Sequence, residues 1–220
     1  MDSNKTDNTK NDIQQRLLDA AESLFCDKGF NGTSIRDITT AADCNVAAVN
    51  YHFGGKESLY AKVFQRHLGA LREIRLASIK HVMSGADGEV TLERLLSGFA
   101  KAFVEPLLDK RGGGRLMTLM VREMLDPHLR KGMFAEEIAI PTLKALGGAI
   151  AVVCPGLSPK DMAMSIISLV GQLLHVIRVR EFLGSEPNAG FPMPSLSEMI
   201  DHIVRFSVAG IEAAANSNRS

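Results

Sequence analysis

Apolar residues recur every three to four positions along most of the chain, which is the spacing of one face of an α-helix. A polar segment, residues 1–11, comes first; it has almost nothing to bury and is predicted to be a disordered arm. The first amphipathic helix follows, and Gly29 can end it in the left-handed conformation, with Phe30 as the apolar residue that often follows such a cap. No alternating strand pattern and no internal repeat stands out, so the chain is predicted to be all-α.

Capping residues mark the start of further helices in the first third of the chain. Ser34, with an aspartate three residues later, forms a capping-box-like pair before a second, short helix. Asn45 can cap a third helix, and Asp43 lies in the tight turn before it, where aspartate tolerates a left-handed conformation better than most residues. A fourth, long helix is predicted to begin at Lys56 and to run to about residue 84.

The remainder of the chain also shows helical patterns. Predicted helices cover about residues 91–108, 115–125, 159–182 and 195–215. Asp126 followed by Pro127 predicts a further helix start, and Pro141 should kink or split that helix. Residues 185–194 are predicted to be a loop because they contain proline and glycine.

Composition excludes some classes and leaves others open. Lys and Arg number 25 and Asp and Glu number 25, so the formal net charge is zero and says nothing about nucleic acid. The three cysteines have no CxxC spacing, which argues against a disulfide framework or a zinc site and favours the cytoplasm. A membrane-spanning segment is not expected, because the apolar stretches look too short to cross a bilayer, and the N-terminus is polar and unlike a signal peptide.

Three short helices with a tight turn before the third describe a helix-turn-helix. The segment LLDAAESLFCDKGFNGTSIRDITTAADCNVAAVNYHFGGKESLYAKVF resembles the DNA-binding segment of TetR-type repressors, without a gap from Ile13 to about Phe64. The matching elements are Ala20-Ala21, Leu24-Phe25, Gly29-Phe30, Thr33-Ser34 with Arg36-Asp37-Ile38, and Tyr51-His52-Phe53 followed by Lys56-Glu57. The resemblance implies a DNA-binding domain over residues 12–64, with its motif at about 34–53, and a helical effector-binding and dimerisation domain over residues 65–216.

The predicted DNA contacts fall into two groups. Contacts to the DNA sugar–phosphate backbone, which position the protein on the duplex, are expected at helix N-termini and at the end of the third helix. The residues are Thr33, Ser34, Asn45, Tyr51, His52 and Lys56. Base reading is expected from Arg36, Val46, Ala47, Ala48 and Asn50. Asparagine can pair with adenine and arginine with guanine, whereas valine and alanine offer only apolar contact, so some dependence on DNA shape is expected.

The family resemblance implies a homodimer whose last two long helices pack as a four-helix bundle, and hence a palindromic operator. The residues support it: the stretch 161–181 is apolar on more than one face and so needs two partners. The small residues Ser165, Gly171, Ala209 and Gly210 would permit close approach. The alternative is a helix simply buried in the core of a monomer.

An effector pocket is predicted from apolar side chains with a few polar ones among them. The candidates are Phe99, Phe103, Met117, Met120, Glu123, Met124, Phe134, Gln172, His175 and Arg178. The alternative is that the methionines and phenylalanines are core residues, as is usual at helical spacing, and that Arg178 only forms an ion pair. The segments EPLL (Glu105 to Leu108) and LMVREMLDPH (Leu119 to His128) resemble a TetR subgroup linked to drug efflux and antibiotic sensitivity. That resemblance suggests a small hydrophobic effector.

Other classes of function receive less support. The sequence has no nucleophile elbow, no HExxH and no dinucleotide fingerprint, and its histidines are scattered, so an enzyme, a metal site and a cofactor are not expected. The prediction is a transcriptional repressor released from its operator by an effector. The alternative is a DNA-binding architectural or adaptor protein with no small-molecule effector.

Overall fold

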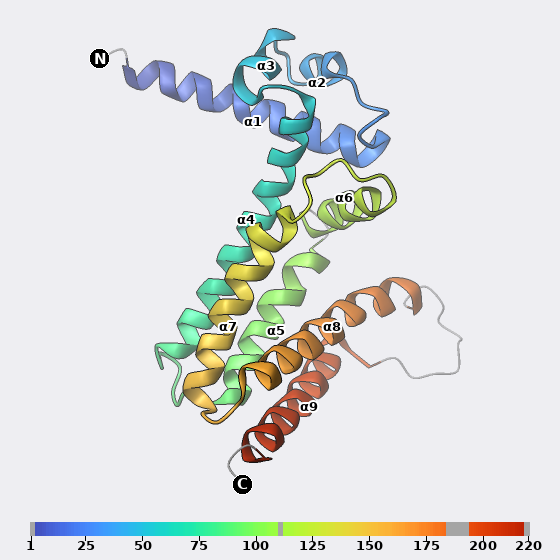
Figure 1. Ribbon diagram of the computed structural model, residues 1–220. Helices are drawn as coiled ribbons and strands as arrows, with labels where there is room; N and C mark the ends of the chain where they lie inside the picture. Colours follow the sequence, from blue (N-terminus) through green and yellow to red (C-terminus); the bar gives the residue numbers. More distant parts are fainter. Residues whose placement is uncertain (1–2, 110–111, 184–193, 218–220) are drawn as a thin grey trace. The chain divides into compact units, whose positions relative to one another are not determined.

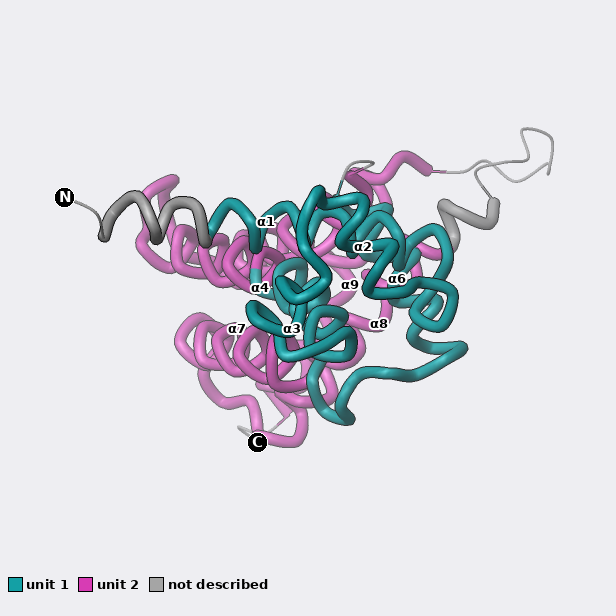
Figure 2. The backbone as a smooth tube through the Cα atoms, turned by 90° about the horizontal axis from the view of Figure 1, so that it is seen from above, with its two compact units in different colours: residues 1–69, 110–134 teal, residues 70–109, 135–220 magenta. Residues whose placement is uncertain are grey.

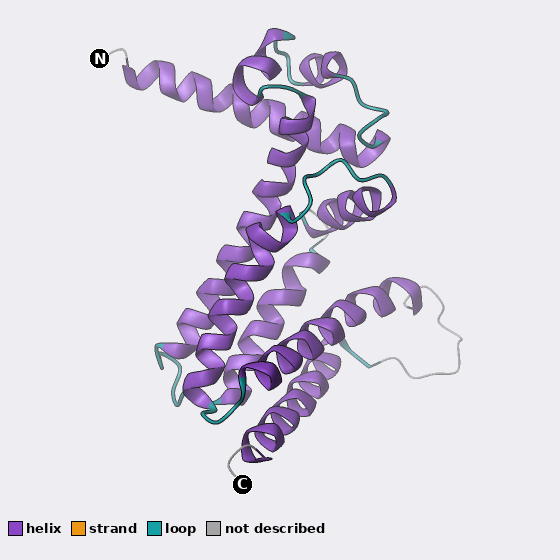
Figure 3. Ribbon diagram, viewed as in Figure 1, coloured by secondary structure: helices purple, strands orange, loops and turns teal. Residues whose placement is uncertain are grey.

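The computed structural model describes residues 3–109, 112–183 and 194–217, and within these ranges the chain is helical without a strand (Figure 3). The elements are α1 (Ser3–Lys28), α2 (Ile35–Ala41), α3 (Ala47–Phe53), α4 (Lys56–Met83), α5 (Leu92–Leu108), α6 (Gly113–Leu125), the π-helical turn η1 (Ala135–Ala139), α7 (Ile140–Val153), α8 (Pro159–Leu183) and α9 (Leu196–Ser217) (Figure 1). The predicted all-α class is confirmed.

The chain divides into two compact units (Figure 2). Unit 1 comprises residues 1–69 and 110–134, and unit 2 comprises residues 70–109 and 135–220. This division differs from the predicted one, in which all residues after 64 form one domain. The segment that contains α6 joins the N-terminal helices because α6 is bonded to α1 through several side chains, described below.

α1 is longer than the sequence pattern indicated. It begins at Ser3, so residues 3–11, which were predicted to be a disordered arm, form its first turns. Those residues contain neither glycine nor proline, so their sequence does not interrupt the backbone hydrogen bonds that extend the helix. The other end is as predicted: Gly29 has a φ of +72°, and its N–H donates to the carbonyl of Phe25 at 3.0 Å.

The cap of α2 and the turn before α3 match the sequence expectation. Ser34 and Asp37 form a capping box, with the Ser34 hydroxyl accepting from the Asp37 N–H and the Asp37 carboxylate accepting from the Ser34 N–H. Asp43, with a φ of +50°, takes the left-handed conformation in the turn. The Asn45 side chain accepts the N–H of Ala47 at 2.9 Å, but α3 starts one residue later than predicted, so that Val46 and not Asn45 is its N-cap.

The core of unit 1 is an aromatic cluster. Phe25 and Tyr60 meet edge to face with ring centroids 4.8 Å apart, and Tyr60 contacts Phe64 in the same way at 5.1 Å. Phe30 stacks on His128 at 4.0 Å, which brings the segment after α6 against the end of α1. Such contacts bury large apolar areas with defined geometry, and they fix how α1, α4 and the 126–134 segment pack.

The helix predicted to start at Asp126 does not form. Residues 126–132 are loop and turn, and the next helix begins only after them, through η1 into α7. Pro141 has no N–H to donate to the carbonyl of Glu137 four residues earlier. That carbonyl accepts instead from the Arg72 guanidinium at 2.9 Å, which explains why a π-helical turn is stable at this point.

Unit 2 consists of the second part of α4 with α5, η1, α7, α8 and α9. α5 contributes buried residues along almost its whole length, and its Pro106 is accommodated two residues before the helix ends. α8 begins at the predicted Ser158 cap and α9 at the predicted Ser195–Glu198 capping box. Most of the loop predicted over residues 185–194 lies outside the described residues.

The expectation that no segment is long and apolar enough to span a bilayer needs a correction at α8. Among the described residues, Pro159–Arg178 is long and apolar enough to cross a membrane, and 28% of that stretch is buried. One such helix is weak support for a membrane span, because helices of soluble proteins pass the same test. Its apolar residues instead occupy more than one face: Leu169, Leu173 and Ile177 are buried in unit 2, whereas Met164, Ile167 and Leu174 are exposed.

Candidate nucleic-acid interface and effector region

The exposed face of α3 carries the side chains predicted to read DNA bases. Val49 is fully buried and anchors the helix, while Val46, Asn50 and Tyr51 are exposed on its other sides. Ala47 is exposed and Ala48 is half-buried, and Arg36 is exposed on α2. The structure therefore presents one amide on α3 and one guanidinium on α2 that could hydrogen-bond base edges.

Thr33 does not suit the predicted phosphate contact. It is 1% exposed, and its hydroxyl donates to the backbone carbonyls of Leu24 at 3.1 Å and Gly29 at 2.8 Å. The side chain therefore stabilises the turn after α1. The sequence pattern did not reveal this role because the threonine precedes a helix, where a hydroxyl is usually free to cap or to bind an anion.

Ser34 is exposed, but its hydroxyl donates to the Asp37 carboxylate at 2.7 Å. Hydrogen bonds from Ser34 hold the pKa of Asp37 below its usual range, so the start of α2 carries a negative charge at neutral pH. That charge repels a phosphate. The predicted phosphate contact at Ser34 is therefore disfavoured in this arrangement.

Lys56, Tyr51 and His52 lie at the junction of α3 and α4. The Lys56 ammonium is 4.1 Å from the centroid of the Phe30 ring, a cation–π contact that orients its side chain. Tyr51 and His52 meet edge to face with centroids 4.9 Å apart. Tyr51 is 75% exposed, whereas Nδ1 of His52 is buried without a hydrogen-bond partner in the described part of the chain. Of this aromatic pair, Tyr51 is thus the more exposed residue.

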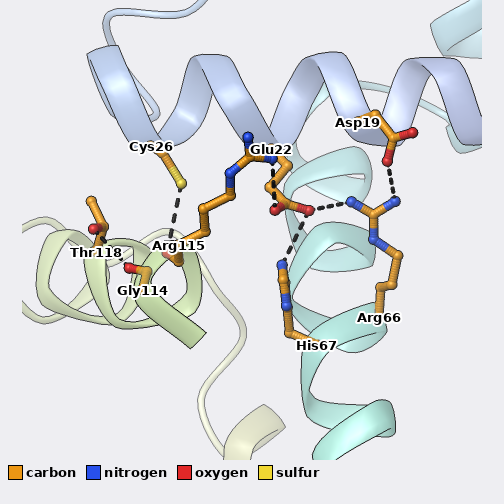
Figure 4. A network of polar contacts seen from close by, with 8 residues as sticks. All are labelled: Asp19, Glu22, Cys26, Arg66, His67, Gly114, Arg115 and Thr118. Atoms are coloured by element: carbon orange, nitrogen blue, oxygen red, sulfur yellow. Dashed lines mark hydrogen bonds and ion pairs between the residues drawn. The ribbon is translucent and has the colours of Figure 1, made fainter. Parts of the chain in front are cut away.

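A charged cluster that the sequence pattern did not indicate joins α1, α4 and α6 (Figure 4). Glu22 is 4% exposed, and its carboxylate pairs with Arg66, with His67 at 3.1 Å and with Arg115 at 3.4 Å. Burial alone would raise the pKa of Glu22, but the hydrogen bonds and charges of His67 and Arg66 lower it to about 2. In the sequence, the only indication of this cluster is that Glu22, a carboxylate, follows Ala21 of the apolar stripe of α1.

Further bonds hold α6 to the end of α1. The Arg122 guanidinium donates to the carbonyls of Cys26 at 3.0 Å and Asp27 at 2.9 Å. Glu123, a predicted effector ligand, is buried, and its carboxylate accepts the backbone N–H groups of His128 and Leu129. Glu123 therefore caps the loop after α6, and its role as an effector ligand stays a prediction.

The other predicted effector residues divide between the units. Met117, Met120, Met124 and Phe134 belong to unit 1, where Phe134 packs against Phe64 with centroids 5.6 Å apart and Met124 is exposed. Phe99, Phe103, Gln172, His175 and Arg178 belong to unit 2. The structure thus does not assemble the predicted set within one unit, because helical spacing alone cannot show which helices are neighbours.

Within unit 2, Gln172 and His175 are brought together in a hollow of about 920 Å³ between α8 and α9. Met199, His202 and Phe206 complete its main walls. Phe99 and Phe103 are instead buried with ring centroids 5.8 Å apart, and Arg178 is exposed and does not line this hollow.

α8 and α9 also present an apolar surface to solvent. Ile167 and Phe206 are both 64% exposed, and Met164 and Leu174 are exposed on the same two helices. A Cβ added to Gly171 or Gly210 would meet nothing within 4 Å, so neither glycine is needed for contacts inside the described chain. These features leave space for another helix to approach closely.

Two family profiles match the chain. Residues 17–63 match the family described as bacterial regulatory proteins, tetR family. Residues 92–211, more than half of the chain, match the C-terminal domain of the HTH-type transcriptional dual regulator CecR. Neither match bears on drug efflux, which stays a prediction.

Individual proteins agree with the profiles. The transcriptional regulator YttP of Bacillus subtilis is 44% identical over 138 residues, which cover 58% of this chain and 62% of YttP. The repressor Rv3405c of Mycobacterium tuberculosis is 32% identical over 127 residues, which cover 57% and 63%. The chain thus spans less than two thirds of the length of these curated relatives. The multidrug-binding protein EbrR, solved with malachite green, shares the fold at 20% identity, with a TM-score of 0.60 over 88% of this chain and 96% of EbrR.

Proposed function

Because the chain belongs to the TetR family of transcriptional regulators, we propose that it is a cytoplasmic, homodimeric repressor that leaves a palindromic operator when a small molecule binds unit 2. The observation that carries the DNA-binding part is the face of α3. Asn50 and Tyr51 are exposed there, after a left-handed turn at Asp43 and on a helix anchored by the buried Val49.

Operator recognition is proposed to rest on few direct base contacts. Asn50 would pair with adenine and Arg36 with guanine, while Val46 and Ala47 would contact apolar groups such as thymine methyls. Tyr51 and Lys56 would contact the sugar–phosphate backbone. Because so few long polar side chains are available, part of the specificity would come from the shape of the DNA.

The homodimer is supported by the apolar surface of α8 and α9. A face that exposes Ile167, Leu174 and Phe206 next to open glycine positions is costly in water and is suited to burial against a second copy. An isologous interface brings two recognition helices into a two-fold arrangement, which a palindromic site would match.

The operator is found by selecting bound sequences from random duplex DNA, and affinity is then measured by fluorescence anisotropy at fixed salt. We expect one palindrome to be enriched, and Asn50→Ala to weaken its binding about 10- to 100-fold, since a paired contact to a base contributes roughly 1–3 kcal/mol. The matched control is Asn11→Ala, on the exposed side of α1, which should bind within about twofold of wild type. Equal binding to all sequences would favour an architectural protein and refute the repressor.

Effector control is tested by titrating candidate small molecules into the protein–operator complex. A ligand that binds the operator-free arrangement better must shift the population and release the DNA. A solved neighbour of the same fold holds the dye malachite green, which supports testing apolar organic molecules first. If every ligand that binds the protein leaves operator affinity unchanged, the effector part of the proposal fails and the DNA-binding part stands.

A further inference from the structure

Arg75, on the part of α4 that belongs to unit 2, is a buried cation without an anionic partner. It is 6% exposed, and no carboxylate of the described residues forms an ion pair with it. Its guanidinium carbon lies 3.8 Å from the centroid of the Phe103 ring, and its Nε has no hydrogen-bond partner. Buried charges in proteins are normally paired, so this exception calls for a counter-ion.

Arg72, one turn earlier on the same helix, shows the usual arrangement. Its side chain is 30% exposed, lies 3.5 Å from the Glu137 carboxylate and donates to the Glu137 carbonyl. Burial lowers the pKa of Arg75 to about 10, so it remains charged at neutral pH. Arg72 thus has a carboxylate from η1 beside it, whereas no carboxylate of the described residues pairs with Arg75.

Thr142 on α7 is a second buried polar group without a partner. It is 2% exposed, and its hydroxyl has no hydrogen bond in the described part of the chain. α4 and α7 run in the same direction (Figure 1), and the Arg72–Glu137 contact sets their register. Arg75 lies about one turn after Arg72, and Thr142 lies about one and a half turns after Glu137, so along the helix axes the two residues are separated by less than one turn.

We propose that Arg75 and Thr142 bind the carboxylate of an amphipathic organic acid, the effector class for this regulator. The Phe103 ring covers the face of the guanidinium, which leaves the edge formed by Nε–H and one terminal N–H for a carboxylate held side-on by two hydrogen bonds. The Thr142 hydroxyl would donate a third. The apolar body of the ligand would pack among the apolar side chains of unit 2, which include Phe99.

A monoanion fits better than a phosphate ester. Arg75 is the only Lys or Arg among the buried residues of the described chain, so a dianionic phosphate would leave one negative charge uncompensated. A neutral or cationic apolar ligand would leave Arg75 itself uncompensated. This inference rests on the proposed effector control and narrows its hydrophobic effector to one that carries an acid group.

The test uses the full chain without DNA and measures the thermal unfolding midpoint with straight-chain carboxylates of six to twelve carbons and with the amides of the same length. Wild type should be stabilised by at least one carboxylate and not by its amide. Arg75→Met should weaken carboxylate binding at least about tenfold, because it removes two hydrogen bonds between charged groups, which contribute more than hydrogen bonds between neutral groups. Thr142→Val removes one hydrogen bond from a neutral hydroxyl and should weaken binding by a few-fold. The matched control, Lys80→Met, removes an exposed cation from the same part of α4 and should bind within about twofold of wild type.

The inference is overturned if no carboxylate stabilises wild type more than its amide, or if Arg75→Met keeps the preference for the carboxylate. Should Arg75→Met not fold, the comparison of acid with amide in wild type decides by itself. Carboxylate binding with no operator binding would refute only the proposed function, whereas operator release by neutral ligands alone would refute only this inference.

Discussion

Replacing Glu22 by glutamine tests whether the buried cluster of Figure 4 holds unit 1 together. The substitution keeps the size of the side chain but removes the charge that Arg66, His67 and Arg115 share. Two guanidinium groups then lose their common anion. We expect Glu22→Gln to fold with lower stability at neutral pH.

The pKa shift sets the magnitude. The pKa of Glu22 falls from an ordinary value of 4.5 to about 2, and each pKa unit corresponds to about 1.4 kcal/mol, so the ionised carboxylate contributes about 3 kcal/mol. A carboxyl group whose folded pKa is lowered stabilises the fold above its unfolded pKa, and this stabilisation is lost as the pH falls towards the folded pKa. At pH 5 almost all of it is present, and at pH 3 roughly 1.5 kcal/mol remains.

The assay is urea unfolding followed by far-UV circular dichroism, at pH 5 and pH 3 and at one protein concentration, because association with a second copy would shift the midpoint. The stability difference between wild type and Glu22→Gln should shrink by about 2 kcal/mol from pH 5 to pH 3. Asp19→Asn is the matched control. Asp19 pairs with Arg66 from a 68% exposed position, so its loss should cost less than about 1 kcal/mol. A difference that stays constant or grows as the pH falls would refute the account of the cluster.

Three further predictions address the caps, the turn and the proposed dimer. Ser34→Ala removes the capping box with Asp37 and should cost about 1 kcal/mol in urea unfolding; an unchanged midpoint would mean that the cap contributes nothing. Asp43→Gly relieves a left-handed φ of +50° and should raise the thermal midpoint, corresponding to roughly 0.5–1 kcal/mol; a lower midpoint would contradict it. Ile167→Glu should convert the dimer to a monomer in light scattering, whereas Val121→Glu, also at an exposed apolar position, should not; a dimer in both variants would exclude this face as the interface.

Local chemistry was predictable wherever it depends on residues close in the chain. Gly29, Ser34, Asp43 and Ser158 each act as predicted, because a cap or a turn involves atoms within about four residues of one another. The spacing of apolar residues likewise identified the helices that are long and strongly periodic. The exposure of Asn50 beside the buried Val49 follows from the same periodicity.

Errors arose where local rules compete with contacts from elsewhere. Thr33 resembles a cap, but the carbonyls of Leu24 and Gly29 occupy its hydroxyl. Asp126 with Pro127 resembles a helix start, but the Glu123 carboxylate binds the N–H groups of His128 and Leu129 and stabilises a loop. In both cases a hydrogen bond that satisfies a buried polar group outweighs a local preference of about 1 kcal/mol.

The sequence by itself determined the class of this protein: an all-α chain whose first third forms a helix-turn-helix, since helical period, caps and turn are properties of short segments. Only the tertiary structure decided that α6 belongs with the DNA-binding helices, through Arg115 and Arg122. It alone showed that Arg75 is buried without a counter-ion. Which distant side chains meet depends on how helices pack, and a single sequence does not specify those neighbours.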